Sequence, residues 1–281
     1  MRRLILGLLV TAACAGLPEE DQQGGTFALN AVPKRVQHIP YGGGPVLHQP
    51  REVNLYWGAY FETAAGRHER DLLDAFARRA GGTRWWSTVT QYTDQDGAVK
   101  SASVEGQSLV VTSPAPGSAV TDQDLMTLVQ SQLSKGALRW DPEAVYFVFT
   151  PPQVVVHGGK RGGGTSCKDL CGYHHHIALP VKGVGLADIK YGSIPHGDCP
   201  DGCTVKGVSV NGSVLDQETV TLSHELAEAA TDPDLDAYTT HHGDNELGDL
   251  CNGGSAVNWS GEKFAVQDLW SNAARHCTSG D

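Results

Sequence analysis

The segment from Val220 to Pro233 constrains the fold most, because its pattern predicts a helix with two chemically different sides. It reads Val-Thr-Leu-Ser-His-Glu-Leu-Ala-Glu-Ala-Ala-Thr-Asp-Pro. At about 100° per residue, His224, Glu225 and Glu228 fall within roughly a quarter-turn, while leucine and alanine fill the opposite side. The proline ends the helix, because the residue before it is biased away from helical geometry. We therefore expect a helix whose apolar side lies against a sheet.

The polar side of this helix has the spacing of a metal site. Zinc accepts imidazole nitrogen and carboxylate oxygen, and catalytic zinc has three protein ligands and a water. His224 and Glu228 lie one turn apart and can hold the same ion, while Glu225 lies beside it, where a general base belongs. The alternative is an amphipathic helix with an ordinary polar face. Such a face would more often carry Lys and Arg, and this one has neither.

A downstream segment, Glu246-Leu-Gly-Asp249-Leu-Cys251, supplies candidates for the third ligand. Its two carboxylates are three residues apart and follow Glu228 by eighteen positions. Glu246 and Asp249 are both possible ligands, and the alternative is that they are surface acids or cap a helix.

Several sequence blocks together resemble the EXORDIUM / phosphate-induced protein family. They are the helix block, the Glu-Leu-Gly-Asp-Leu-Cys block, Val53–Gly58, Trp85–Trp86, Cys171–His174 and Lys263–Val266. The resemblance implies an extracellular protein with a zincin-like centre. It also favours Glu246 over Asp249 as the third ligand, because the glutamate is the more regular feature of the family pattern.

The N-terminus has the pattern of an export signal. Two arginines precede an apolar run of ten residues, Leu4 to Ala13, which is too short to span a bilayer. Cys14 follows Thr-Ala-Ala and resembles the cysteine of a bacterial lipobox, although the same residues fit ordinary signal cleavage. The polar stretch after Cys14 would serve as a tether, which favours lipidation and anchoring to the cell envelope over free secretion.

Six further cysteines predict a disulfide framework, since an even number in an exported chain is typical of one. They are Cys167, Cys171, Cys199, Cys203, Cys251 and Cys277. The first two and the next two are close enough in sequence to pair locally, which would leave Cys251 with Cys277. A zinc–thiolate site is disfavoured, because oxidised cysteines are not ligands.

The order of apolar segments predicts the α/β (α+β) class. The apolar run Ala144–Thr150 is typical of a central strand, Thr121 begins a capped helix, and Thr204–Val210 has the pattern of another strand. Asp216 is expected to cap the metal helix. The resemblance implies one zincin-like domain, with a twisted mixed sheet, an active-site helix and disulfide-stapled loops.

Three parts of the chain are predicted from these patterns: a signal at 1–14, a flexible linker at 15–50 and the folded domain at 51–281. The formal charge of −11 excludes a nucleic-acid partner, which would require a basic face.

Two further residues are candidates for assisting catalysis. His174, in Tyr-His-His-His, matches the family block and is a candidate to face the substrate or stabilise a transition state. Tyr238 lies between the helix and Glu246, where a phenol can hydrogen-bond an oxyanion. His196 and the pair His241-His242 give weaker signals.

The sequence thus predicts an exported zinc metallohydrolase, most simply a peptidase, acting on a peptide or on a polymer of the cell surface or wall. The alternative is a non-catalytic cell-surface or wall-associated binding protein that retains the zincin frame. A structural zinc would be closed by a fourth protein ligand, for which Asp249 and His174 are the candidates.

Overall fold

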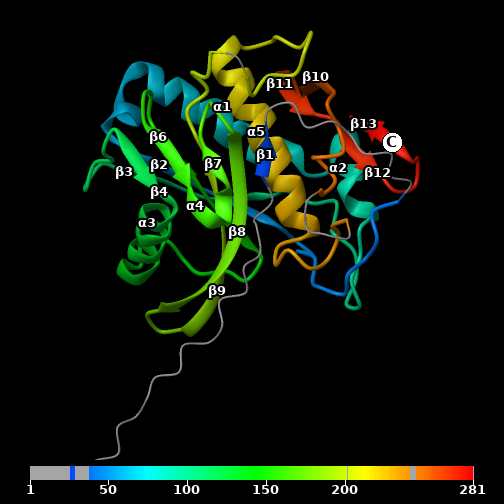
Figure 1. Cartoon of the computed structure of the whole chain (residues 1–281), viewed down its shortest axis with the longest axis horizontal. Coiled ribbons are helices and arrows are strands. Elements are labelled where there is room, and N and C mark those ends of the chain that lie inside the picture. Colours follow the sequence, from blue (N-terminus) through cyan, green and yellow to red (C-terminus); the bar gives the residue numbers. More distant parts are fainter. Residues whose placement is uncertain (1–25, 29–37, 201, 241–244, 281) are drawn as a thin grey trace, which may run out of the picture.

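The computed structural model describes residues 26–28, 38–200, 202–240 and 245–280. The predicted signal with Cys14, and the pair His241-His242, lie outside these ranges. The centre of the fold is a six-stranded sheet in the order β1-β8-β9-β5-β2-β3 (Figure 1). These strands are β1 (Thr26–Ala28), β2 (Arg51–Trp57), β3 (Glu105–Val111), β5 (Ala144–Phe149), β8 (Leu170–Val181) and β9 (Gly185–Ile194).

The sheet is mixed, as the sequence predicted. β2 is parallel to β3 and to β5, and β5 is parallel to β9. β8 and β9 form a long antiparallel hairpin, and β1 pairs antiparallel with β8. Helices connect β2 to β3 and β3 to β5, whereas a tight turn at 182–184 joins the hairpin.

The two faces of the sheet belong to different cores, because side chains alternate along each strand. In β2, Val53, Leu55 and Trp57 pack into one core and Tyr56 into the other. Helices cover both faces of the sheet. They are α1 (Ala64–Ala80), α2 (Arg84–Ser87), α3 (Asp122–Lys135), α4 (Gly159–Gly162) and α5 (Ser213–Thr231), with 3₁₀ turns η1 (Ala59–Glu62) and η2 (Val89–Gln91).

α1 and α5 share one core, and α3 packs into the other. The predicted start of α3 is confirmed: Thr121 and Asp124 form a reciprocal capping box. α5 lies along β8 on one side and against β11 on the other, as Figure 1 shows. Three smaller sheets complete the fold, formed by β4 (Ala119–Thr121), β6 (Val155–Gly158), β7 (Gly164–Thr165), β10 (Gly254–Trp259), β11 (Glu262–Gln267), β12 (Leu269–Ser271) and β13 (His276–Thr278).

The predicted strand at Thr204–Val210 is wrong. Gly207 adopts a left-handed conformation at φ 83°, and the N–H of Val208 donates to the carbonyl of Val205, so the chain turns here. The three valines of the segment pack on Val220 and Ala265 without pairing to a strand. These valines therefore pack in a small core rather than in a sheet.

Asp216 does not cap α5. The helix begins at Ser213 after Gly212, and Asp216 is its fourth residue. The Asp216 carboxylate accepts the N–H groups of Val210 (2.9 Å) and Asn211 (3.0 Å). It thus ties the preceding loop to the helix.

The folded part also includes residues 38–50, which the composition had placed in the linker. Ile39, Val46 and Leu47 are 0–3% exposed and belong to the core shared by α1 and α5. The N–H of Leu47 donates to the carbonyl of Ala230 near the end of α5.

Three disulfides are present, as expected, but the local pairing is wrong for two of them. Cys167 pairs with Cys199 and Cys171 with Cys203, while Cys251 pairs with Cys277 as proposed. The cause is the β8–β9 hairpin, in which Tyr173 lies opposite Ser193. Continuing that register places position 199 opposite position 167, which accounts for Cys167–Cys199, while Cys203 reaches Cys171 through the loop that follows.

Among the described residues, no helix is both long enough and apolar enough to cross a membrane.

Candidate metal centre

The predicted metal-binding residues of α5 lie in the protein interior. All of its residues from Asp216 to Thr231 are buried. His224, Glu225 and Glu228 are each 0% exposed. Because these side chains are buried away from solvent, their charge states depend on one another and on the groups packed against them.

His224 and Glu228 meet a carboxylate from the turn that follows α5. Nε2 of His224 lies 2.9 Å from Oε2 of Glu228 and 3.6 Å from Oδ1 of Asp249. The other oxygen of Glu228 accepts the backbone N–H groups of Gly248 (3.1 Å) and Asp249 (3.2 Å). One oxygen of Glu228 is thus held by the turn, and the other faces the imidazole. The three side chains offer ligand atoms within 4.8 Å of one another.

Gln267, at the end of β11, fixes the orientation of His224. Its amide nitrogen donates to the carbonyl oxygens of Gly248 (2.9 Å) and Cys251 (2.6 Å). The amide oxygen lies 2.8 Å from Nδ1 of His224 and can only accept, so Nδ1 carries the hydrogen. A neutral His224 then directs its Nε2 lone pair at two carboxylates. Only a cation between them, a proton or a metal ion, makes that arrangement favourable.

A second imidazole approaches the same centre from the sheet. Nδ1 of His174, in β8, lies 3.3 Å from Oε2 of Glu225 and 3.9 Å from Oε2 of Glu228. The close approach depends on Gly172, where a Cβ would lie 2.5 Å from Thr221 on α5. His174, Glu225 and Glu228 form a second group with ligand atoms within 4.8 Å.

The structure places Asp249, rather than Glu246, beside His224 and Glu228. Oε1 of Glu246 lies 3.7 Å from Nε2 of His174, on the other side of the centre. Burial, and the nearby carboxylates of Glu228 and Asp232, raise the pKa of Glu246 well above its ordinary value. The residue is therefore in the centre, but not in the position preferred from the family pattern.

The centre contains more acids than the described basic groups can neutralise. Burial alone would lower the pKa of His224, but Glu228 and Glu225 raise it to about 10. Burial, and then the charge on Glu228, raise the pKa of Asp249 well above its ordinary value. No Lys or Arg of the described ranges forms an ion pair with these acids.

This donor set suits a divalent metal ion. Imidazole nitrogen and carboxylate oxygen are ligands of zinc, and each group of the cluster supplies one or both. Oε2 of Glu228 is buried without a hydrogen bond of ordinary geometry. An ion held between this oxygen, His224 and Asp249 would give it a partner.

Tyr238 does not reach the centre. Its hydroxyl donates to the carbonyl of Thr93 at 2.7 Å and accepts the N–H of the same residue. Its ring lies between those of Tyr41 and Tyr92. The phenol is engaged in packing, and we do not include it among the residues of the centre.

Sequence patterns missed Gln267, Gly248 and Asp232. Asp232 directly follows α5, and its buried carboxyl, whose pKa burial raises to about 6, is close to that of Glu246. A glycine between two acids was the one available signal for Gly248, and a lone glutamine in a strand gives none.

Taken together, the fold and the site define a class: a disulfide-linked, mixed α/β protein with a buried centre of histidines and carboxylates built around one helix. The chain belongs to the phosphate-induced protein 1 family, whose conserved region matches residues 39–256.

Two relatives from Arabidopsis thaliana are similar over most of their length. Protein EXORDIUM-like 3 is 24% identical over 85% of this chain and 82% of its own length. Protein EXORDIUM-like 5 is 24% identical over 86% of this chain and 77% of its own length. No solved structure matches the chain. The disulfides and these relatives are compatible with an extracellular protein.

Proposed function

We propose that this chain is an exported zinc metallohydrolase, most simply a peptidase, with the metal held by His224, Glu228 and Asp249. The observation that carries the proposal is the direction of the His224 ring. Gln267 occupies Nδ1, and Nε2 faces two carboxylate oxygens at 2.9 and 3.6 Å. On this geometry we assign Asp249, rather than Glu246, as the third ligand.

The hydrolytic part of the proposal rests on Glu225 and His174. When bound, zinc would polarise a carbonyl oxygen and lower the pKa of water. Glu225 lies on the same helix face and would take the proton of that water as general base. His174, 3.3 Å from Glu225, would orient the carboxylate and stabilise its charge. Two carboxylates and one imidazole leave a bound ion less positive than two imidazoles would, which predicts slow hydrolysis.

Zinc counting tests the metal assignment. We expect His224→Ala to hold about one equivalent of zinc less than the wild type, as measured by elemental analysis of folded, purified protein. Ser209→Ala, at an exposed position away from the centre, is the matched control and should hold as much zinc as the wild type. Equal zinc in the wild type and His224→Ala would refute the assignment.

Glu225→Gln separates catalysis from binding. The amide keeps the shape of the side chain but cannot take a proton, so zinc should stay and hydrolysis should fall about 10²–10⁴-fold. Casein and peptide libraries are the substrates, with chelated protein as the blank. Equal rates for wild type and Glu225→Gln on every substrate would exclude this role.

A second candidate is a non-catalytic binding protein of the cell surface or wall. The observation that favours it is enclosure: Glu225 is 0% and His174 1% exposed, so an ion here would be closed off by protein. A surface hollow of about 540 Å³ lies elsewhere, between the end of α1 and the β10–β11 hairpin, and is lined by Arg79, Arg84 and Trp259 among others. In this case zinc would be retained, Glu225→Gln would have no phenotype, and Arg84→Ala would weaken binding to wall polymer.

A further inference from the structure

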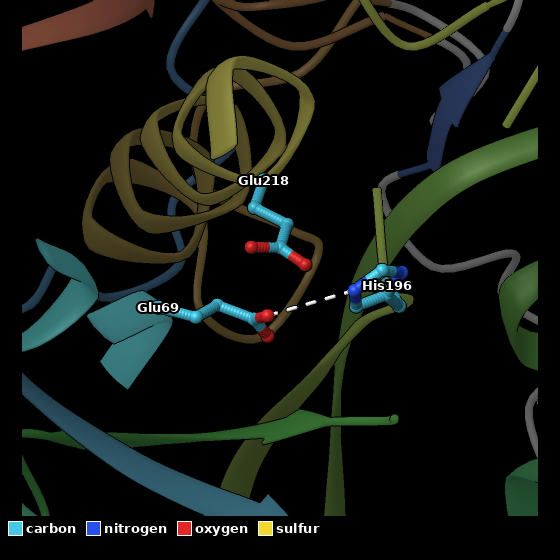
Figure 2. Close-up of side chains that lie close together, drawn as sticks. All are labelled: Glu69, His196 and Glu218. Carbon is cyan, nitrogen blue, oxygen red and sulfur yellow. Dashed lines mark ion pairs between the residues drawn. The ribbon is translucent and has the colours of Figure 1, made fainter. Parts of the chain in front are cut away.

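A second cluster of buried titratable groups lies on α5, two turns before the centre described above. Glu218 precedes Glu225 by seven residues and therefore lies on nearly the same helix face, about 10 Å away along the axis. Glu69 of α1 and His196, just after β9, converge on it. The three side chains are 1–6% exposed, and Figure 2 shows the two carboxylates facing each other with the imidazole ring beside them.

The protein fixes one oxygen of each carboxylate. Oε1 of Glu218 accepts the N–H of Gly197 at 3.1 Å, and Oε2 of Glu69 accepts the hydroxyl of Tyr60 at 2.9 Å. The remaining oxygens, Oε2 of Glu218 and Oε1 of Glu69, are buried without a hydrogen-bond donor. Each acid therefore has an oxygen available to a ligand inside the cluster.

His196 is placed between carboxylates at distances longer than hydrogen bonds. Its Nε2 lies 3.5 Å from Oε2 of Glu69, and its Nδ1 lies 3.4 Å from Oδ1 of Asp198. Neither ring nitrogen has a hydrogen bond of ordinary geometry. A carboxylate on the outer nitrogen of a histidine, with the inner nitrogen directed at other ligands, is the usual arrangement around bound metal.

Among the described residues, no Lys or Arg balances the charge of this cluster. Within the described ranges, neither Glu69 nor Glu218 forms an ion pair with Lys or Arg. A half-buried cluster of the same composition in this chain, His176 with Asp188 and Asp234, contains Lys190, whose Nζ lies 2.5 Å from Asp188 and 3.5 Å from Asp234. The amine of Lys190 thus neutralises the half-buried cluster, whereas no described Lys or Arg does so for the cluster of Glu69, His196 and Glu218.

We propose that Glu69, His196 and Glu218 form a second metal site that binds a divalent ion of the zinc class. Their ligand atoms lie within 4.8 Å of one another, and a tetrahedral zinc with bonds of about 2.0–2.2 Å would draw them to roughly 3.3 Å. The site would join α1, α5 and the segment after β9, and every ligand is buried. Asp198 is a positioning residue that orients His196.

The rival explanation is a proton shared by the two glutamates next to a charged histidine. Burial, followed by the charge of Glu69, raises the pKa of Glu218 well above its ordinary value, which is compatible with such a proton. A shared proton and a metal ion differ in one measurable way, because only the metal site binds zinc.

Zinc stoichiometry in four proteins tests the proposal independently of the first centre. After chelation and zinc titration, we expect two equivalents in the wild type, one in His224→Ala, one in Glu218→Gln and none in the double variant. Asp71→Asn, at an exposed acid on α1, is the control for Glu218→Gln and should keep both equivalents. Asp198→Asn should bind zinc about 10–100-fold more weakly at this site only.

Two results would overturn the proposal. One is equal zinc in His224→Ala and in the double variant, which would assign the remaining ion to another place. The other is the absence of zinc from folded His224→Ala. This variant leaves the second cluster unchanged, so the result can be interpreted even if Glu218→Gln does not fold. Failure of the first centre looks different, since His224→Ala would then bind as much zinc as the wild type.

Discussion

Gly248 lies where the segment Glu246–Cys251 packs tightly against α5. A Cβ at this position would lie 2.5 Å from Nδ1 of His224 and 2.9 Å from Oε1 of Glu228. Its N–H also donates to Glu228. Only a residue without a side chain lets the backbone reach the carboxylate, and this explains the glycine between Glu246 and Asp249.

We expect Gly248→Ala to displace the His224 ring. Overpacking of this kind costs about 1–3 kcal/mol, and zinc affinity should fall as well, because His224 loses its place between Gln267 and Glu228. Thermal unfolding and zinc titration measure the two effects. Gly117→Ala, at an exposed glycine, is the control; a Gly248→Ala protein with the stability and zinc affinity of this control would contradict the account.

Asp94 is a residue whose ionisation stabilises the fold. Burial would raise its pKa, but the N–H of Val46, the ring of His48 and the N–H groups of Asp96 and Gly97 lower it to about 2. An unfolded Asp has a pKa of about 3.9. The stabilisation is therefore complete above about pH 4 and is lost as the pH falls toward about 2.

Asp94→Asn should remove this dependence. We expect the variant to be less stable at pH 7 by on the order of 2 kcal/mol, because hydrogen bonds to a charged acceptor are lost. Between about pH 4 and pH 2 it should lose less stability than the wild type. Denaturant unfolding across this range measures both effects, with Asp96→Asn as control; parallel pH profiles for wild type and Asp94→Asn would show that Asp94 is not responsible.

The residues of the centre differ in how far sequence could predict them. His224, Glu225 and Glu228 share one helix, so helical periodicity alone placed them together. Asp249 and Glu246 were both found as candidates, but choosing between them required the path of the turn. Gln267 could not be found, because its position depends on the packing of β11 against α5.

At the scale of elements, the β8–β9 hairpin decides the disulfide pairing. Cys167–Cys199 and Cys171–Cys203 each close a separation of 32 residues and join the start of β8 to the segment after β9. That segment contains His196, and β8 contains His174. The two bridges therefore hold the strand and loop that bring both histidines to α5.

Removing one of these bridges should destabilise the protein without preventing zinc binding. For a loop of this length the entropic contribution is about 3–4 kcal/mol, so we expect Cys171→Ser/Cys203→Ser to fold with a lower midpoint in denaturant. Peptide mapping of the wild type without reduction should recover Cys167 linked to Cys199. Recovery of Cys167 linked to Cys171 would restore the local pairing that the sequence suggested.

For the whole molecule, apolar runs and helix caps predicted the main elements, including β5 and the capping box of α3. The mixed sheet followed from the family resemblance. Two features could not be predicted from the sequence. Residues 38–50 were predicted as linker because they are rich in glycine and proline. Residues 204–210 were predicted as a strand because a small core requires closely spaced apolar residues just as a strand does.

The burial of residues 38–50 leads to a prediction about the limits of the domain. Ile39, Val46 and Leu47 each contribute roughly 1.5–3 kcal/mol on burial, a sum comparable with the 5–15 kcal/mol that stabilises a typical protein. A chain exported from residue 51 onward should therefore fail to fold, and one from residue 38 onward should fold. Protease resistance and circular dichroism compare the two, and a folded chain from residue 51 would show that this segment is dispensable.

The three-residue strand β1 has a consequence for how copies of the chain meet. It pairs with β8 from Leu170 to Tyr173 and so occupies the outer edge of the sheet. An unpaired strand edge is a template for adding another chain. Without residues 26–28, the backbone next to His174 would present such an edge, and a second molecule could complete the sheet in their place. With only three residues, β1 offers far less unpaired backbone for such pairing than β8 would offer without it.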